Sequence, residues 1–140
     1  MASDASPCHG DDGFMTKALV IDDDDIAREM IVSVLRDDGY ETFDLPSPIG
    51  ATQLILKEGI ELVILDLIMP ALSGDKLARM LRQNQRMQGL IIVLVSSSAI
   101  DQLRAVAASV QADAVVYKGD IASKLLPALA SARSAQVRQA

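Results

Sequence analysis

The most regular feature of the chain is a series of short, nearly continuous apolar runs. Four of them have the length of a strand, at residues 18–21, 62–65, 90–95 and 114–116. A run without alternating polar positions is typical of a strand that is buried on both faces of a parallel sheet. Residues 40–43 instead alternate between apolar and polar side chains, which favours a strand at the edge of the sheet. The pattern therefore predicts five strands.

Between these runs, apolar residues recur at spacings of three and four, as on one face of a helix. Three such stripes are formed by Ile26, Met30, Ile31, Val34 and Leu35, by Leu77, Met80 and Leu81, and by Ile100, Leu103, Val106, Ala107 and Val110. Ser47 followed by Pro48 predicts the start of another helix, which runs to about residue 57. A fifth helix is expected over 123–137, with Ser123 as its N-cap. Pro127 then falls in the first turn, where its missing N–H has no partner within the helix.

Strands and helices thus alternate five times along residues 17–140. Such alternation favours one α/β domain with an open parallel sheet, helices on both faces and right-handed crossovers. Residues 1–16 are small, polar and rich in turn formers, and they show no apolar period. We therefore expect a disordered N-terminal tail at 1–16, followed by a single folded domain.

Charge and composition disfavour several classes of function. The 140 residues carry a net charge of −6, which argues against direct DNA binding through a basic surface. The longest apolar run falls far short of the ~20 residues that cross a membrane, and no secretory signal is visible. We therefore expect a cytoplasmic protein with no membrane partner. A single cysteine also excludes a framework of intramolecular disulfides.

Polar residues that follow the buried strands carry the candidate chemistry. Asp22 and Asp23 follow the first strand, and Asp66 follows the third. Ser96 follows the fourth strand, and Lys118 follows the last. Parallel strands end at one edge of a sheet, and open α/β folds bind ligands at that edge, so we expect these side chains to share one pocket.

Three carboxylates in one pocket repel one another, by about 4 kcal/mol per pair at ~4 Å and an effective dielectric constant near 20. Lys118 offsets part of this repulsion, and a hard divalent cation would offset more. Oxygen ligands suit Mg²⁺ or Mn²⁺ better than zinc. A cation there would also neutralise an incoming phosphoryl group, so that Asp66 could act as a nucleophile while Ser96 and Lys118 contact phosphate oxygens. Of the remaining two aspartates in the run, Asp24 or Asp25 is expected to be the N-cap of the first helix.

Four motifs of the chain are similar to those of one known family. Residues 19–24, Leu-Val-Ile-Asp-Asp-Asp, resemble an acidic motif, and residues 65–74, Leu-Asp-Leu-Ile-Met-Pro-Ala-Leu-Ser-Gly, resemble a phosphoacceptor strand with its Met-Pro-x-x-x-Gly turn. Val-Ser at 95–96 and Val-Tyr-Lys at 116–118 resemble strands that end in a switch hydroxyl and in a lysine. Together they are similar to the receiver domain of two-component response regulators, over about residues 17–135.

The resemblance implies a flavodoxin-like (βα)5 fold of strand order 2-1-3-4-5, in a stand-alone receiver similar to chemotaxis regulators. It implies that Asp66 accepts a phosphoryl group from a sensor histidine kinase or a histidine phosphotransfer protein. Ser96 and Lys118 would contact that group. The implied ligands of Mg²⁺ (or Mn²⁺) are Asp22, Asp23, Asp66 and the backbone carbonyl of Ile68.

By the same resemblance, the domain is not an enzyme beyond its own phosphorylation and dephosphorylation. It would act by switching a surface that a downstream protein target reads. The expected reader surface is the face formed by the fourth helix, the fifth strand and the fifth helix.

Three positions depart from the family pattern. Gly119 stands where the family usually has proline, so we expect the loop to hold Lys118 less firmly. Val115 stands where the family often has Tyr or Phe coupled to the switch hydroxyl, and strand alternation points Tyr117 to the face opposite its neighbour Val116. Ser97 stands where Ala or Gly is common, and it narrows access to the phosphoryl group.

Two other interpretations stay open. A phosphatase of the haloacid dehalogenase type would use Asp22 as nucleophile, with Asp24, Ser96 and Lys118 beside it. Against this interpretation, the threonine that usually follows the second aspartate is missing, and only one acid, Asp120, follows the lysine. A degenerate receiver that acts only as a binding module is compatible with the departures above, although the set of acids is complete.

Overall fold

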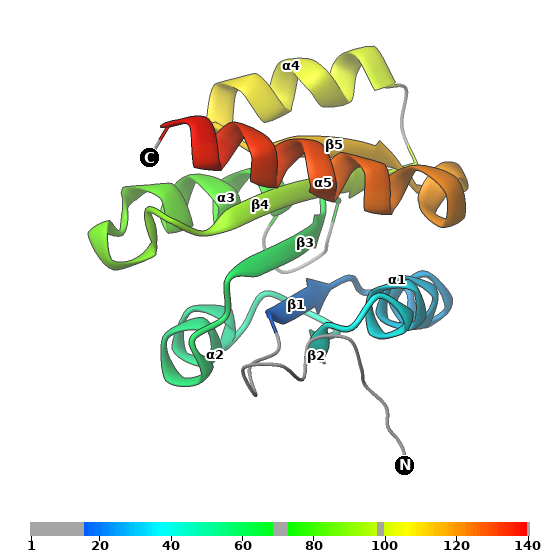
Figure 1. The fold of residues 1–140 in the computed structure, drawn as a ribbon, viewed down its shortest axis with the longest axis horizontal. Coiled ribbons are helices and arrows are strands. Elements are labelled where there is room, and N and C mark those ends of the chain that lie inside the picture. Colours follow the sequence, from blue (N-terminus) through cyan, green and yellow to red (C-terminus); the bar gives the residue numbers. More distant parts are fainter. Residues whose placement is uncertain (1–15, 69–72, 98–99, 140) are drawn as a thin grey trace.

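The computed structural model describes residues 16–68, 73–97 and 100–139. They form a five-stranded parallel sheet in the order β2-β1-β3-β4-β5, with helices on both faces (Figure 1). The strands are β1 (Lys17–Ile21), β2 (Glu41–Leu45), β3 (Leu62–Asp66), β4 (Ile91–Ser96) and β5 (Ala114–Tyr117). The helices are α1 (Asp25–Asp37), α2 (Ala51–Glu58), α3 (Gly74–Gln83), α4 (Ile100–Val110) and α5 (Ile121–Gln139), with short 3-10 turns η1 (Gln85–Met87) and η2 (Lys118–Asp120). The predicted fold class and strand order are confirmed.

Two stretches with sequence predictions lie outside the described residues. These are the tail expected over 1–16, apart from Thr16, and residues 69–72 of the Met-Pro-x-x-x-Gly turn.

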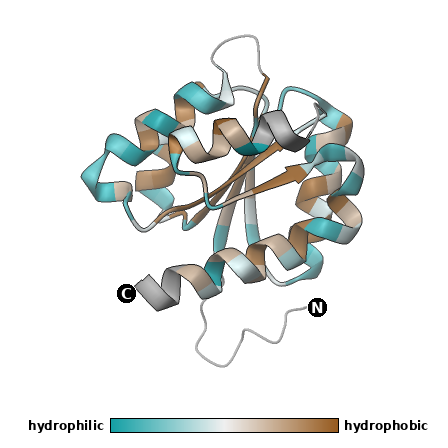
Figure 2. Ribbon diagram, turned by 90° about the horizontal axis from the view of Figure 1, so that it is seen from above, coloured by the Kyte–Doolittle hydropathy of each residue, from teal (hydrophilic) through white to brown (hydrophobic). Residues whose placement is uncertain are grey.

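The sheet separates two apolar layers. One layer packs α2, α3 and the end of α4 against Leu19, Val63 and Ile92. The other packs α1 and α5 against Val20, Ile64 and Val93. Every residue of β3 and β4 is buried, as the continuous apolar runs predict. Figure 2 shows the strands in brown across the centre, with teal concentrated on the outer helices and loops.

The buried stripe of α1 differs from the predicted one. Ile31, Val32 and Leu35 are buried, whereas Ile26 is 75% exposed and Met30 is 45% exposed. The buried positions follow the helical spacing 28, 31, 32 and 35, so the stripe begins at a charged residue, Arg28, whose side chain is only 14% exposed. Apolar periodicity assigned Ile26 to the core because it could not recognise an arginine as part of the buried face. Met80 of α3 is likewise exposed, since the buried face there is Gly74, Leu77, Ala78 and Leu81.

Two predicted helix starts are wrong. Helix α2 begins at Ala51, after Gly50 with a φ of 85°, and the Ser47 hydroxyl instead accepts a hydrogen bond from the Ile49 N–H within the preceding turn (3.3 Å). Serine and proline also favour such turns.

Helix α5 follows directly on η2 and begins at Ile121, so Ser123 is not its N-cap. The Ser123 hydroxyl donates to the carbonyl oxygen of Asp120 (3.4 Å). Pro127 is therefore the seventh residue of the helix and not part of its first turn. It is exposed and lies off the buried stripe of this helix, which is formed by Ile121, Leu125, Leu129 and Ala132.

Candidate functional site

The polar residues singled out in the sequence meet at the carboxyl edge of the sheet. Asp22 follows the last residue of β1, and Asp66 is the last residue of the neighbouring strand β3. Ser96 ends β4, one residue beyond Val95, which is the register partner of Asp66. Lys118 follows β5, at the far side of β4. The predicted convergence at one edge is therefore present.

Three carboxylates lie close together at this edge. One oxygen from each of Asp22, Asp23 and Asp66 falls within 4.8 Å of the others. Asp22 is fully buried and Asp66 is 4% exposed, whereas Asp23 is exposed. Two of the three charges are thus held in a medium that solvates them poorly, and they require a compensating positive charge.

Lys118 supplies one such charge from within the chain. Its Nζ lies 2.9 Å from Asp22 Oδ2 and 3.2 Å from Asp66 Oδ2. The contact with Asp22 Oδ2 is an ion pair, and this buried oxygen accepts no other hydrogen bond from the described residues. The glycine that follows the lysine has therefore not prevented Lys118 from bridging both acids.

Burial perturbs the protonation of both partners. Desolvation raises the pKa of Asp66 from 3.8 to about 6, and the charge of Asp22 adds to the rise. The Ile68 N–H, which donates to Asp66 Oδ1 at 3.2 Å, and the Lys118 ammonium act in the opposite direction. Burial on its own would lower the pKa of Lys118, but the two neighbouring carboxylates raise it overall. The ammonium therefore stays charged at neutral pH.

The backbone around Asp66 is held by a close approach of α3. The Gly74 N–H donates to the carbonyl oxygen of Leu67 at 2.8 Å. A Cβ atom at Gly74 would lie 2.2 Å from the carbonyl oxygen of Asp66, so only glycine fits this position without a shift of the backbone. The glycine of the Met-Pro-x-x-x-Gly motif thus allows the first residue of α3 to pack directly on the end of β3.

The four consecutive aspartates have four different environments. Asp22 is buried in the pocket, and its Oδ1 accepts the Asp24 N–H at 2.9 Å. Asp23 offers an exposed oxygen to the carboxylate cluster. Asp24 is the N-cap of α1, as expected, and accepts the Ile26 N–H at 3.0 Å. Asp25 pairs with Arg28 at 2.6 Å.

These environments bear on the phosphatase interpretation, which requires Asp24 beside the nucleophile. The Asp24 side chain is exposed and occupied with capping the helix. It does not belong to the cluster of carboxylates that the structure brings together.

The remaining predicted residues lie nearby with different exposure. Ser96 is fully buried, whereas its neighbour Ser97 is exposed. Ile68 is 63% exposed, and its backbone N–H faces Asp66. Tyr117 is 40% exposed and Val116 is buried, which confirms the alternation predicted at the end of β5.

The donor set suits a hard divalent cation. All three clustered ligand atoms are carboxylate oxygens within reach of a single ion, and Mg²⁺ or Mn²⁺ prefers such oxygens. The buried Asp22 Oδ2 without a directed hydrogen bond is an acceptor that an ion or a bound water would satisfy. The residues present therefore fit the expected metal.

Sequence reasoning missed Arg28. Its guanidinium donates to the backbone carbonyl of Asp22 and to two other aspartates. The only signal in the sequence is its spacing of three, four and seven residues from the buried Ile31, Val32 and Leu35.

Among the described residues, no helix is both long enough and apolar enough to cross a membrane.

Comparisons with known proteins place the chain in a family. Residues 18–130 match the family model of the response regulator receiver domain. The chain is 28% identical over 100 residues to the phosphate regulon transcriptional regulatory protein PhoB of Pseudomonas aeruginosa, covering 71% of this chain and 44% of that protein. It is 31% identical over 86 residues to the DNA-binding response regulator MtrA of Mycolicibacterium smegmatis, covering 61% of this chain and 36% of that protein. The chain thus spans about half the length of these curated relatives or less.

Solved structures share the fold. The chemotaxis protein CheY4 of Vibrio cholerae superposes with a TM-score of 0.76 at 23% identity, over 83% of this chain and 97% of that one. A CheY-like receiver domain protein from Methanospirillum hungatei gives a TM-score of 0.79 at 20% identity, over 91% of this chain and 100% of that one.

Proposed function

The chain belongs to the response regulator receiver domain family of two-component signalling, and from that premise we propose that Asp66 accepts a phosphoryl group. The observation that carries the proposal is the bridging of Lys118 Nζ between the buried carboxylates of Asp22 and Asp66. A nucleophilic carboxylate, a compensating cation and a set of oxygen ligands are the parts that phosphoryl transfer to an aspartate requires.

In the proposed reaction, a carboxylate oxygen of Asp66 attacks the phosphorus of a phosphohistidine. The new oxygen–phosphorus bond forms as the bond from phosphorus to the imidazole nitrogen breaks, and the freed imidazole takes up a proton. Lys118 would neutralise charge on the phosphoryl oxygens, and Ser96 would contact one of them. The chain would catalyse only its own phosphorylation and dephosphorylation.

Receiver domains bind Mg²⁺ at an acidic pocket, and the acids of this chain fit that role. We assign its ligands as Asp22, Asp23 and Asp66 together with the backbone carbonyl of Ile68. The ion would supply charge neutralisation to the incoming phosphoryl oxygens. Mn²⁺ has the same preference for oxygen ligands and should substitute for it.

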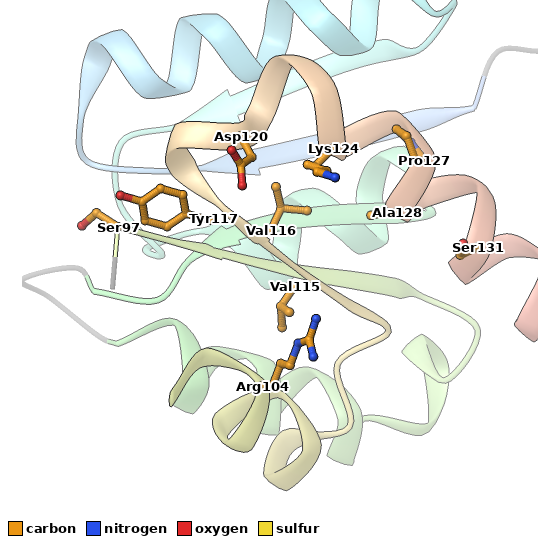
Figure 3. Close-up of a pocket in the computed structure, with 10 residues that line it drawn as sticks. All are labelled: Ser97, Arg104, Val115, Val116, Tyr117, Asp120, Lys124, Pro127, Ala128 and Ser131. Atoms are coloured by element: carbon orange, nitrogen blue, oxygen red, sulfur yellow. The ribbon is translucent and has the colours of Figure 1, made fainter. Parts of the chain in front are cut away.

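The donor is a sensor histidine kinase or a histidine phosphotransfer protein, and a downstream protein reads the phosphorylated state. A groove of 720 Å³ between α4, β5 and α5 supports the predicted position of the reader surface. Val115 and Val116 of β5 lie in its wall, and Figure 3 shows Val115 directed toward Arg104 and Val116 toward Lys124. At Val115 the groove lacks the bulk of the aromatic residue that the family often carries there.

Direct DNA binding remains disfavoured by the net charge of this chain. The relative MtrA is described as a DNA-binding response regulator, but this chain covers little more than a third of it. We therefore propose a protein target for the described domain.

Intact-mass measurement after incubation with acetyl phosphate and Mg²⁺ tests the proposal. We expect the wild type to gain the mass of one phosphoryl group, and Asp66→Asn to gain none. Asp37→Asn, an exposed acid on α1, is the matched control and should label like the wild type. Equal labelling of wild type and Asp66→Asn would refute the assignment.

The same preparation separates the two alternatives. A phosphatase would hydrolyse many equivalents of a phosphate ester such as p-nitrophenyl phosphate, and Asp22→Asn would abolish that turnover. A degenerate receiver would show neither labelling nor turnover.

A further inference from the structure

The position of Asp22 depends on three hydrogen bonds around its backbone and side chain. Its N–H donates to the carbonyl oxygen of Leu45 at 3.2 Å, across from β1 to the end of β2. Its Oδ1 accepts the Asp24 N–H at 2.9 Å. Its own carbonyl oxygen accepts Nη1 of Arg28 at 2.8 Å. Of these three hydrogen bonds, only the one from Arg28 is donated by a side chain. The Lys118 ammonium pairs with the Asp22 carboxylate, whereas Arg28 contacts the peptide that joins Asp22 to Asp23.

Arg28 is itself held at two other points. Its Nε donates to Asp44 Oδ2 at 3.0 Å, and its Nη2 donates to Asp25 Oδ1 at 2.6 Å. The three nitrogens of one rigid guanidinium therefore reach the end of β1, the first residue of α1 and a residue of β2. A planar fork with fixed donor directions suits this task better than a single ammonium. The side chain is 14% exposed and occupies a position of the buried face of α1.

This arrangement has two opposing effects on a cation at the acidic pocket. The positive charge of the guanidinium, next to the backbone of two proposed ligands, disfavours a second cation. The fixed Asp22–Asp23 peptide favours one, because the carboxylates are already oriented and lose little freedom on binding. The sign of the net effect therefore distinguishes a positioning role from simple electrostatics.

We propose that Arg28 is a positioning residue of the metal site, which orients Asp22 and Asp23 for Mg²⁺ through the Asp22 carbonyl. The inference rests on the proposed function of the pocket, since it takes Asp22 and Asp23 as ligands. Arg28 touches neither the ion nor the phosphoryl group in this scheme. Removal of such outer contacts typically weakens metal binding by 10- to 100-fold.

Arg82 provides a matched control within the same fold. Its Nη2 pairs with Asp113 at 2.5 Å, and its other nitrogens donate to the carbonyl oxygens of Leu90 and Gln111 at 2.6 and 2.9 Å. It too is 14% exposed. These acceptors precede β4 and β5, so they lie at the amino edge of the sheet, away from the acids. Arg82 thus matches Arg28 in exposure and in its three hydrogen bonds, but it does not contact the acidic pocket.

The test compares Arg28→Met, Arg28→Lys and Arg82→Met by isothermal titration with MgCl₂, with thermal unfolding in EDTA as the measure of stability. We expect Arg28→Met to raise the Mg²⁺ dissociation constant about tenfold or more. Arg28→Lys keeps the charge, so the rise that we expect in its dissociation constant reports geometry alone. Arg82→Met should lower the melting temperature in EDTA but bind Mg²⁺ like the wild type.

Unchanged or tighter Mg²⁺ binding by Arg28→Met would overturn the proposal, and tighter binding would show that charge dominates. If Arg28→Met does not fold, Arg28→Lys decides: an unchanged dissociation constant overturns the positioning role. If Arg82→Met weakens Mg²⁺ binding as much as Arg28→Met does, general destabilisation explains both results, and the positioning role of Arg28 is overturned as well. A wild type that binds no Mg²⁺ would overturn both the metal site and the role of Arg28. Labelling by acetyl phosphate reports separately whether Asp66 accepts a phosphoryl group.

Discussion

The proposed role of Asp66 sets two conditions that oppose each other. Its burial against Asp22 favours the protonated form and raises its pKa to about 6, whereas nucleophilic attack requires the ionised form. The Lys118 ammonium and the Ile68 N–H limit the rise. At neutral pH the carboxylate is therefore ionised but held in an unfavourable environment, and a bound cation would relieve this destabilisation of the native state.

This environment predicts a dependence of stability on pH. Because the folded pKa of about 6 exceeds the ordinary value of 3.8, the native state holds the Asp66 proton more tightly than the unfolded state does. The contribution of Asp66 to stability is greatest below pH 4 and is lost as pH rises through 6. At pH 7.5 the ionised group therefore costs up to about 3 kcal/mol without metal.

Asp66→Asn removes this cost, so we expect the variant to be more stable than the wild type at pH 7.5 in EDTA. The difference should shrink toward pH 4. Urea unfolding of both proteins at several pH values measures it. A variant that is less stable at pH 7.5, or a difference that does not change with pH, would contradict the assigned environment.

At the scale of elements, the junction between β3 and α3 depends on one glycine. Alanine at position 74 would improve helix propensity by about 1 kcal/mol, but its Cβ would meet the backbone of Asp66 and Leu67, which cannot rotate away. The steric clash therefore outweighs the gain in helix propensity, and the substitution destabilises the fold. We expect Gly74→Ala to lower the free energy of unfolding by about 2 kcal/mol and to slow labelling by acetyl phosphate, since it displaces the end of β3.

Gly89→Ala is the matched control, because a Cβ there meets nothing within 4 Å. It should change stability by less than about 0.5 kcal/mol. Equal stability of the two variants in urea unfolding would show that the contact at Gly74 is not restrictive.

The elements differ in how far the sequence could predict them. Strands β3 and β4 were predicted to within one residue, because strands buried on both faces carry continuous apolar runs. Helix starts were harder. Ser47 and Ser123 are residue types that often cap helices, but here their hydroxyls form hydrogen bonds in turns. Only the structure shows that α5 follows directly on η2 and therefore contains Pro127 in its interior.

Some residues of the site could likewise be predicted from the sequence, and others could not. Asp22, Asp66, Ser96 and Lys118 could be placed because parallel strands end together, whatever the details of the helices. The contacts of Arg28 and Gly74 could not, since they depend on how closely α1 and α3 approach the strand ends.

For the whole molecule, the proposed metal site would couple cation binding to folding. The carboxylates of Asp22, Asp23 and Asp66 are gathered by the fold, so we expect Mg²⁺ to bind the native state in preference to the unfolded one. At 100 times its dissociation constant, Mg²⁺ should stabilise the fold by about 2.7 kcal/mol. That corresponds to several degrees in melting temperature.

Differential scanning calorimetry with and without millimolar Mg²⁺ measures this shift. Asp22→Asn should lose most of it, and Asp37→Asn should keep it. An unchanged melting temperature of the wild type would count against a metal site.

The end of β4 joins the acidic pocket to the groove. Ser96 is buried at the edge where the acids gather, and Ser97 is exposed in the groove between α4 and α5. Their Cα atoms are neighbours across one peptide bond, about 3.8 Å apart. A displacement of the Ser96 backbone would therefore be felt first at Ser97, in the wall of the groove.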